Sequence, residues 1–261
     1  MTPFLDGKKA KAITSVAVFY DLERPKDFVN AIRNILDIDG IWVLEQSDLG
    51  SMIEANSFDT ICHEHLEYYS LTVINMLLTQ NNLRIFDAEL NASNGGSHRI
   101  YACHENSNFE TNNMALDQLF NREERRKLSE NETYIEFMQK CEIEMQKLCN
   151  FIQKEQAKGK KFHVYGASTK GNVLLQYCGL GAKQIEMAAD RNPRKWGCYT
   201  PGTKIPILSE KTSRSAKPDY LVVLPWHFRQ EFIAREAKLL KRGTSLIFPL
   251  PNFEIFSGDE T

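Results

Sequence analysis

The sequence lacks an excess of charge of either sign, since 32 lysines and arginines stand against 34 aspartates and glutamates in 261 residues. The formal net charge of −2 leaves no broad basic face to bind phosphate backbones, so we expect no nucleic-acid partner. Long apolar runs are also missing: no segment is long enough to cross a bilayer, and the N-terminus has no apolar h-region. We therefore expect no membrane partner.

Closely spaced cysteine pairs are missing as well. The six cysteines form no C-x-x-C pair and no dense framework, which is typical of reduced thiols in a cytoplasmic protein. What the sequence does have is a globular composition, with 42% hydrophobic and 25% charged residues. A chain of this length can form one large domain or two modest ones, and we favour two.

The first part of the chain alternates strand and helix patterns. The β-branched and aromatic run AITSVAVFYDL predicts a buried parallel strand. A helix opened by Pro25 is predicted over PKDFVNAIRNILD, and GIWVLEQS predicts another buried strand, entered through Gly40. Strand, crossover helix and strand make a βαβ unit, so the sheet is expected to begin parallel.

An antiparallel pair is predicted to close this sheet. After a helix over LTVINMLLTQNN, the strands LRIFDAEL and SHRIYACH are joined by the short, turn-rich NASNGG. A parallel sheet closed in this way is similar to the back half of a class I methyltransferase sheet, over residues 12–105. The front half of such a sheet carries a glycine-rich turn for S-adenosylmethionine, and none precedes Ala12. We therefore expect the chain to be truncated relative to that fold.

Residues 109–160 change character and become densely charged and helical. The segment TYIEFMQKCEIEMQKLCNFIQKEQ predicts a long amphipathic helix packed on the body of the protein. A free coiled coil is less favoured, because the apolar seam spans too few heptads. The residues expected on the buried face are Ile135, Met138, Met145, Leu148, Cys149 and Ile152.

A second α/β part follows from residue 161. Strands are predicted at KFHVYG, IEMAADRN, PDYLVVLPW and TSLIFPLP, and helices at STKGNVLLQYCGL and FRQEFIAREAKLLKRG, the latter closed by Gly243. This alternation implies a parallel, doubly wound sheet. The predicted fold class is α/β: a partial class I methyltransferase sheet (back half) in residues 1–108, a helical connector in 109–160 and a Rossmann-like domain in 161–261.

The motif YGASTKGN lies where a strand turns into a helix of this second part. Gly166 and Gly171 would let the backbone approach a ligand closely, and Lys170 supplies a positive charge near free helix amides. This combination favours phosphate binding. The spacing fits neither G-x-G-x-x-G nor the Walker pattern, so a purely structural tight turn stays open as the alternative.

An acid at the end of the next strand adds to this motif. Asp190 stands at about the position where a dinucleotide-type fold keeps an acid for ribose hydroxyls, and Arg191 and Asn192 follow it. A simple helix cap before Pro193 is the alternative. The favoured interpretation is a nucleotide or nucleotide-sugar site, with Lys170 near phosphate and Asp190 near ribose. The residues assigned to it are Gly166, Lys170, Gly171, Asn172, Asp190 and Arg191.

The stretch DTICHEHLEYYS places two histidines on either side of a glutamate. The zinc-binding pattern H-E-x-x-H would need a histidine where the sequence has Glu67, so we expect no metal. In an extended segment His63 and His65 would share one face, and Glu64 would point the other way. An imidazole beside a carboxylate favours acid–base chemistry near neutral pH, with a solvated polar loop as the alternative.

These motifs, together with NGGSHRIY, DRNPRKWGCYTPGTKIPI and PDYLVVLPWHF, closely resemble the S-adenosylmethionine-dependent sugar C-methyltransferases, which act on nucleotide-linked 4-keto sugars. The similarity runs from about Ala12 to Pro251. In that family a zinc-binding domain and a cofactor-binding Rossmann domain precede a Rossmann-like C-terminal domain, and the nucleotide-sugar lies between the latter two. The resemblance implies S-adenosylmethionine as cofactor, with Phe19 and Tyr20 assigned to it, and a nucleotide-diphosphate sugar as substrate. The family's zinc ligands would lie outside this chain.

The resemblance also implies roles in the reaction, which is enolate formation followed by methyl transfer to carbon. His65 matches the general base that removes the proton alpha to the ketone, and Glu64 matches its neighbouring carboxylate. The family motif reads Tyr-x-Glu-His, whereas this chain has Cys62 at the tyrosine position. A thiol is a weak donor toward an enolate oxygen, so either the substrate differs or Tyr68 or Tyr69 substitutes. The residues assigned to catalysis are Cys62, His63, Glu64 and His65.

Without the front half of a class I sheet, the first strand would have an unpaired edge. We expect this edge to be covered by the N-terminal segment, by a second copy of the chain or by a separate polypeptide. The site for the methyl donor would then be incomplete. The alternative function is therefore a non-catalytic module that holds a nucleotide-sugar around Gly166.

Overall fold

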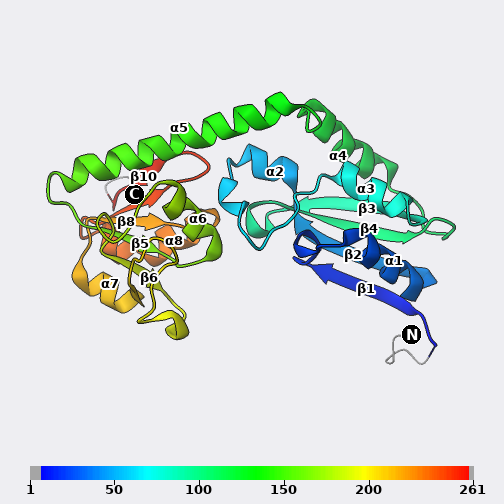
Figure 1. Cartoon of the computed structure of the whole chain (residues 1–261), viewed down its shortest axis with the longest axis horizontal. Coiled ribbons are helices and arrows are strands. Elements are labelled where there is room, and N and C mark those ends of the chain that lie inside the picture. The colour runs from blue at the N-terminus through cyan, green and yellow to red at the C-terminus, as the bar shows by residue number, and fades with distance from the viewer. Residues whose placement is uncertain (1–6, 259–261) are drawn as a thin grey trace. The chain divides into compact units, whose positions relative to one another are not determined.

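The computed structural model describes residues 7–258, which form two compact units with a sheet in each (Figure 1). The first unit comprises the residues up to Ile53 and the range His63–Ile135, and the second comprises Glu54–Cys62 and the residues from Glu136 onward. The short segment Glu54–Cys62 therefore belongs to a different unit from the residues on both sides of it in the sequence.

The sheet of the first unit has four strands within the described residues, in the order β1-β2-β4-β3. β1 and β2 run parallel, whereas β4 runs antiparallel to both of its neighbours. The predicted parallel start and antiparallel closure, and with them the α/β fold class, are confirmed. The strands are β1 (Ala10–Val16), β2 (Leu36–Ser47), β3 (Leu83–Asn91) and β4 (Ser97–His104).

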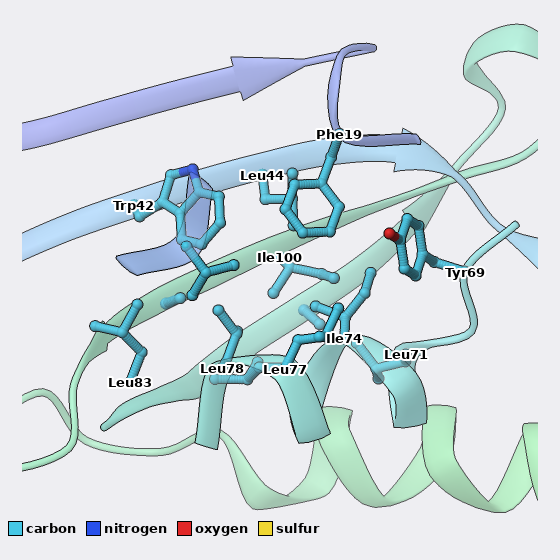
Figure 2. Close-up of a cluster of buried hydrophobic side chains, with 14 of the residues drawn as sticks. Phe19, Trp42, Leu44, Tyr69, Leu71, Ile74, Leu77, Leu78, Leu83 and Ile100 are labelled. Atoms are coloured by element: carbon cyan, nitrogen blue, oxygen red, sulfur yellow. The ribbon is translucent and has the colours of Figure 1, made fainter. Parts of the chain in front are cut away.

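One face of this sheet carries the hydrophobic core of the first unit. Trp42 and Leu44 alternate along β2 and pack with Ile100 of β4 and Ile74 of α3 (Figure 2). On the opposite face Arg99 forms ion pairs with two glutamates, so the strands alternate between apolar and charged residues. The helices of this part of the chain are α1 (Pro25–Ile35), α2 (Leu49–Glu54), α3 (Leu71–Thr79) and α4 (Asn113–Arg125).

β1 is an edge strand, so the prediction of a buried strand was wrong. Among the described residues β1 pairs only with β2, and its side chains are exposed or half-buried except for Ser15. The strand ends at Val16, because Ala17 takes a left-handed conformation with φ of 53° and Phe19–Asp21 forms a short 3-10 helix. A buried strand needs neighbours on both edges. Residues 1–6, part of the segment expected to cover this edge, lie outside the described residues.

β2 begins at Leu36, before the predicted entry at Gly40. The pairing with β1 shifts register between Ala10 and Ala12, and Gly40 lies opposite this irregularity. A Cβ at Gly40 would lie 2.7 Å from the carbonyl oxygen of Ala10. The glycine is therefore needed inside the strand, where the backbone of β1 comes close.

The sheet of the second unit has six strands in the described part of the chain, in the order β10-β9-β8-β5-β6-β7. All neighbouring pairs are parallel except β9 and β10, which confirms the predicted parallel sheet. The chain runs from β5 outward to β7 on one side and from β8 outward on the other, so the strand order reverses between β5 and β8. The strands are β5 (Phe162–Tyr165), β6 (Met187–Asp190), β7 (Ile207–Ser209), β8 (Tyr220–Val223), β9 (Ser245–Phe248) and β10 (Glu254–Phe256).

The helices from α5 onward differ from the sequence prediction in three places, and the first is the helix Glu210–Ala216, which was not predicted. Ile135 and Met138 are exposed, because the buried face of α5 runs instead through Phe137 and Cys141 before reaching the predicted Met145. The single helix predicted to end before Gly243 is broken between α8 and α9. These helices are α5 (Asn131–Gln156), α6 (Thr169–Tyr177), α7 (Glu210–Ala216), α8 (Arg229–Arg235) and α9 (Ala237–Leu240). Within residues 7–258, no helix is both long enough and apolar enough to cross a membrane.

Candidate active site

At the carboxyl end of β1, Tyr20 holds the segment that carries His65. The carbonyl oxygen of Tyr20 accepts hydrogen bonds from the amides of Leu66 (3.0 Å) and Glu67 (3.1 Å). The ring centroids of Tyr20 and His65 lie 4.4 Å apart, with an interplanar angle of 56°. The imidazole is thus held at the end of a parallel strand pair, which is where open α/β sheets bind their ligands.

Aromatic residues close to Tyr20 and His65 in the sequence pack into the hydrophobic core of the first unit. Phe19 is buried, with its ring centroid 5.1 Å from that of Tyr69 and 6.1 Å from that of Trp42 (Figure 2). Burial, helped by the charge of Glu67, raises the pKa of Tyr69 to about 12, so its phenol stays protonated at neutral pH. The assignment of Phe19 and Tyr20 to the cofactor stays a prediction.

Between the two histidines the backbone turns. His63 and Glu64 form a turn, so the alternation expected of an extended segment does not hold. His63 Nε2 lies 3.9 Å from Glu64 Oε1, and these side chains are 82% and 56% exposed, so their attraction is weak. Tyr68 donates a hydrogen bond from its hydroxyl to the carbonyl oxygen of His65 (3.3 Å). In the described ranges, no three His, Cys, Asp or Glu side chains are arranged to hold a metal ion.

The residues just before Cys62 are anchored in the second unit by Asp59. Asp59 is only 1% exposed, and its two carboxylate oxygens accept hydrogen bonds from Trp226 Nε1 (2.9 Å) and Ser57 Oγ (2.8 Å). Burial raises the pKa of Asp59, while these hydrogen bonds and the positive charge of Lys170 act in the opposite direction. Asp59 therefore ties the segment leading to Cys62 to the loop after β8.

The loop after β8 packs closely against the turn after β5. Gly166 has φ of 89°, and a Cβ there would lie 3.0 Å from Pro225 Cγ. A Cβ on Gly171 would lie 2.7 Å from Leu224 Cδ1. Both glycines are thus required by close packing at the point where the strand order reverses, which is also the usual ligand site of such sheets. Their assignment to a ligand stays a prediction.

Charged and polar groups gather around the first turn of α6. Ser168 caps the helix by accepting a hydrogen bond from the amide of Gly171 (3.1 Å). Burial, with the nearby charge of Lys170, lowers the pKa of His227 to about 4, so this imidazole is neutral at pH 7. Asn172 Oδ1 is buried and has no hydrogen-bond partner among the described residues.

Asp190 ends β6 as predicted, and its carboxylate is occupied by backbone amides. It accepts hydrogen bonds from the amides of Ala167 (2.9 Å) and Asn192 (2.8 Å). The cap before Pro193 is provided by Asn192, which accepts a hydrogen bond from the Arg194 amide, so the alternative role for Asp190 as that cap was wrong. Asp190 instead joins the end of β6 to the turn after β5. The predicted ribose contact of Asp190 is untested, as is the role of Arg191, which is exposed.

Three residues of this region were not predicted from the sequence: Asp59, Trp226 and His227. Trp226 is the last residue of the predicted strand PDYLVVLPW and His227 follows it, at the sheet edge where ligand-binding loops lie, and that position was an available signal. Asp59 lies far from Trp226 in the sequence. One sequence alone could not reveal that these two residues contact each other.

A family model described as the C-methyltransferase C-terminal domain matches residues 92–251. The chain belongs to this family. The family assignment confirms the resemblance to C-methyltransferases drawn from the motifs. The C-methyltransferase NovU of Streptomyces niveus is 32% identical over 235 residues, which are 90% of this chain and 56% of that protein. The chain thus spans little more than half the length of this relative.

Two solved methyltransferase structures show a weaker likeness. One is magnesium protoporphyrin IX methyltransferase (ChlM) from Synechocystis PCC 6803 with bound SAH, at 13% identity and a TM-score of 0.30 over 38% of this chain and 46% of that one. The other is the O-methyltransferase NcsB1 of neocarzinostatin biosynthesis, at 14% identity and a TM-score of 0.31 over 38% of this chain and 30% of that one. Similarity at this level is too weak to add to the topology described above.

Proposed function

We propose that this chain forms part of an S-adenosylmethionine-dependent C-methyltransferase that acts on a nucleotide-linked keto-sugar, with His65 as the general base. The observation that carries the proposal is the contact of His65 with Tyr20 at the carboxyl end of β1. Membership in the C-methyltransferase family supports it. Because the chain spans only 56% of its relative NovU, activity is proposed for the whole protein to which these residues contribute.

In this proposal His65 removes the proton from the carbon alpha to the ketone. An imidazole is suited to this role near neutral pH, and the electron pair released moves onto the ketone oxygen as an enolate. A donor must stabilise that oxygen. Tyr68 and Cys62 are the nearest candidates in sequence, and the phenol is the stronger donor of the two.

The methyl donor fits these residues only in part. S-adenosylmethionine, when bound, supplies an electrophilic methyl group for the enolate carbon. Near the end of β1 the apolar residues Val16 and Val18 are 59% and 43% exposed, but the segment 17–21 contains no glycine and builds no glycine-rich turn. Residues other than those described here are therefore needed to hold the donor, and we derive no step through it.

We assign the nucleotide part of the substrate to the carboxyl ends of β5 and β8. Strand order reverses there, which is where doubly wound sheets bind nucleotides. Lys170 supplies positive charge for the diphosphate, and the buried Asn172 Oδ1, which has no partner within residues 7–258, can accept a hydrogen bond from a ligand donor. Asp190 could contact ribose only through lone pairs left over by its two amide hydrogen bonds and by Lys195 Nζ, which lies 3.5 Å from its Oδ2. Six unpaired cysteines fit a reducing compartment such as the cytoplasm.

Exchange of the alpha proton tests His65 without the methyl donor. A nucleotide-linked keto-sugar incubated with the full-length protein in D₂O should lose its alpha-proton NMR signal. The variant His65→Asn should slow this exchange by about 100-fold or more, the usual contribution of a general base. His104→Asn is the matched control, since His104 ends β4 at the opposite end of the sheet and should exchange at the wild-type rate. Unchanged exchange in His65→Asn would rule out its role as base.

The alternative is a module that binds a nucleotide-sugar without catalysis. A nucleotide site at the carboxyl ends of β5 and β8 alone would suffice for this function. The two functions separate in one pair of measurements on the full-length protein. Nucleotide-sugar binding without alpha-proton exchange supports the module, and binding with exchange that depends on His65 supports the enzyme.

A further inference from the structure

Two cysteines of the second unit lie against each other, away from the residues assigned above. Cys149 lies in α5, and Cys178 is the C-cap residue that follows the last residue of α6, Tyr177. Cys149 Sγ lies 3.7 Å from the carbonyl oxygen of Cys178, which brings the two cysteines side by side. Both residues are half-buried, so small molecules in solvent can approach them.

The proximity of the two thiols makes the cysteines chemically unequal. It lowers the pKa of Cys149 to about 7, so about half of this side chain is a thiolate at neutral pH. The same contact raises the pKa of Cys178. By contrast, burial raises the pKa of Cys141 to about 12 and leaves that thiol inert. A part-exposed thiolate next to a second thiol is the arrangement found in redox-sensing cysteine pairs.

We propose that Cys149 and Cys178 are a redox-active dithiol that reacts with a low-molecular-weight disulfide such as oxidised glutathione. The Cys149 thiolate attacks one sulfur of that disulfide, the S–S bond breaks, and one glutathione thiolate leaves. Cys178 then loses its proton and attacks the Cys149 sulfur, which releases the second glutathione thiolate. In the balance, the protein pair gives up two electrons and two protons and forms one S–S bond, while the oxidant becomes two thiols.

The disulfide would join α5 to the C-terminal end of α6, the helix whose first turn carries Lys170. Closing the chain between positions 149 and 178 restricts the unfolded state, so oxidation should raise the Tm by roughly 5 °C. The variant Cys178→Ala should show no such rise, because it cannot close the loop.

Peptide mass spectrometry after treatment with oxidised glutathione tests the proposal. In the wild-type protein we expect a peptide pair linked through Cys149 and Cys178. Cys178→Ala should stop at a stable glutathione adduct on Cys149, and Cys149→Ala should leave Cys178 unmodified. Cys198→Ser, which removes an exposed thiol elsewhere, should give the wild-type yield of linked peptides. A stable glutathione adduct on Cys149 in the wild-type protein, or no linked peptide, would overturn the proposal.

The rate of alkylation provides a second readout that does not depend on the disulfide. Iodoacetamide should modify Cys149 with a pH midpoint near 7, as its pKa requires. The midpoint should move toward the ordinary thiol value of about 8.5 in Cys178→Ala, because the donor is lost. An identical midpoint in both proteins would contradict the thiol–thiol contact.

Discussion

At the scale of single residues, the buried Asp59 stabilises the second unit through its two side-chain hydrogen bonds. Asp59→Ala removes the acceptor for Trp226 Nε1 and leaves this buried donor unsatisfied, whereas Ser57 Oγ keeps Thr60 Oγ1 as a partner at 3.1 Å. We expect the free energy of unfolding to fall by about 2–3 kcal/mol, and by less in Asp59→Asn, which keeps one acceptor oxygen. Urea denaturation measures both. The exposed Asp117→Ala is the control, and an Asp59→Ala value equal to that control would refute the anchoring role.

His227 predicts how stability depends on pH. Its folded pKa of about 4 lies below the ordinary value of 6.5, so between these values the unfolded chain binds a proton that the folded chain does not. Stability should therefore fall as the pH drops from about 6.5 toward 4, by up to about 1.4 kcal/mol per pH unit for this one group. Burial also lowers the pKa of His163, so the measurement compares the slopes of wild-type protein and His227→Gln in urea titrations. Parallel slopes would contradict the shift at His227.

At the scale of elements, alanine variants of two glycines distinguish the cost of backbone strain from the cost of a packing clash. Gly166 and Gly159 have φ of 89° and 80°, but only at Gly166 would a Cβ meet a neighbour, Pro225 Cγ at 3.0 Å. Both alanine variants should lose about 1 kcal/mol of stability from the positive φ. Gly166→Ala should lose more and should also weaken nucleotide binding, as measured by denaturation and calorimetry. Equal effects of the two variants would mean that the turn does not pack as described.

The unpaired edge of β1 predicts association with a second strand. β1 pairs only with β2 in the described part of the chain, and Val16 near its end is 59% exposed. Sedimentation velocity should show concentration-dependent self-association that Val16→Lys reduces, because a charged residue on an edge strand opposes pairing. Ile143→Lys, an equally exposed apolar residue of α5, is the control and should associate like the wild type. A monomer at every concentration would contradict pairing with a second copy.

Sequence patterns predicted elements better than they predicted which faces are buried. The parallel and antiparallel pairings followed from connection length, since a crossover helix or a short turn allows only one of them. The burial of β1 and of Ile135 could not be predicted, because helical or strand spacing does not reveal which neighbour covers a face. β7 and β10 were missed because segments this short carry no period.

At the scale of the whole chain, the stretch Asp59–Ser70 is divided between the two units, since Cys62 belongs to the second unit and His63 to the first. Acid–base chemistry could be predicted for this stretch from its residue types, because an imidazole and a carboxylate are adjacent in the sequence. The anchoring of the same stretch by Trp226 could not, since that contact joins residues far apart in the chain.

The most direct test is calorimetric titration of the chain with a nucleoside diphosphate sugar, and separately with S-adenosylmethionine. We expect the nucleotide-sugar to bind, Lys170→Met to weaken this binding by at least about tenfold, the order of a lost charge-assisted contact, and the exposed control Lys183→Met to leave it unchanged. We expect no binding of S-adenosylmethionine to this chain alone. Nucleotide-sugar binding that is absent, or that is equal in Lys170→Met and the wild type, would contradict the assignment of the substrate site to the ends of β5 and β8.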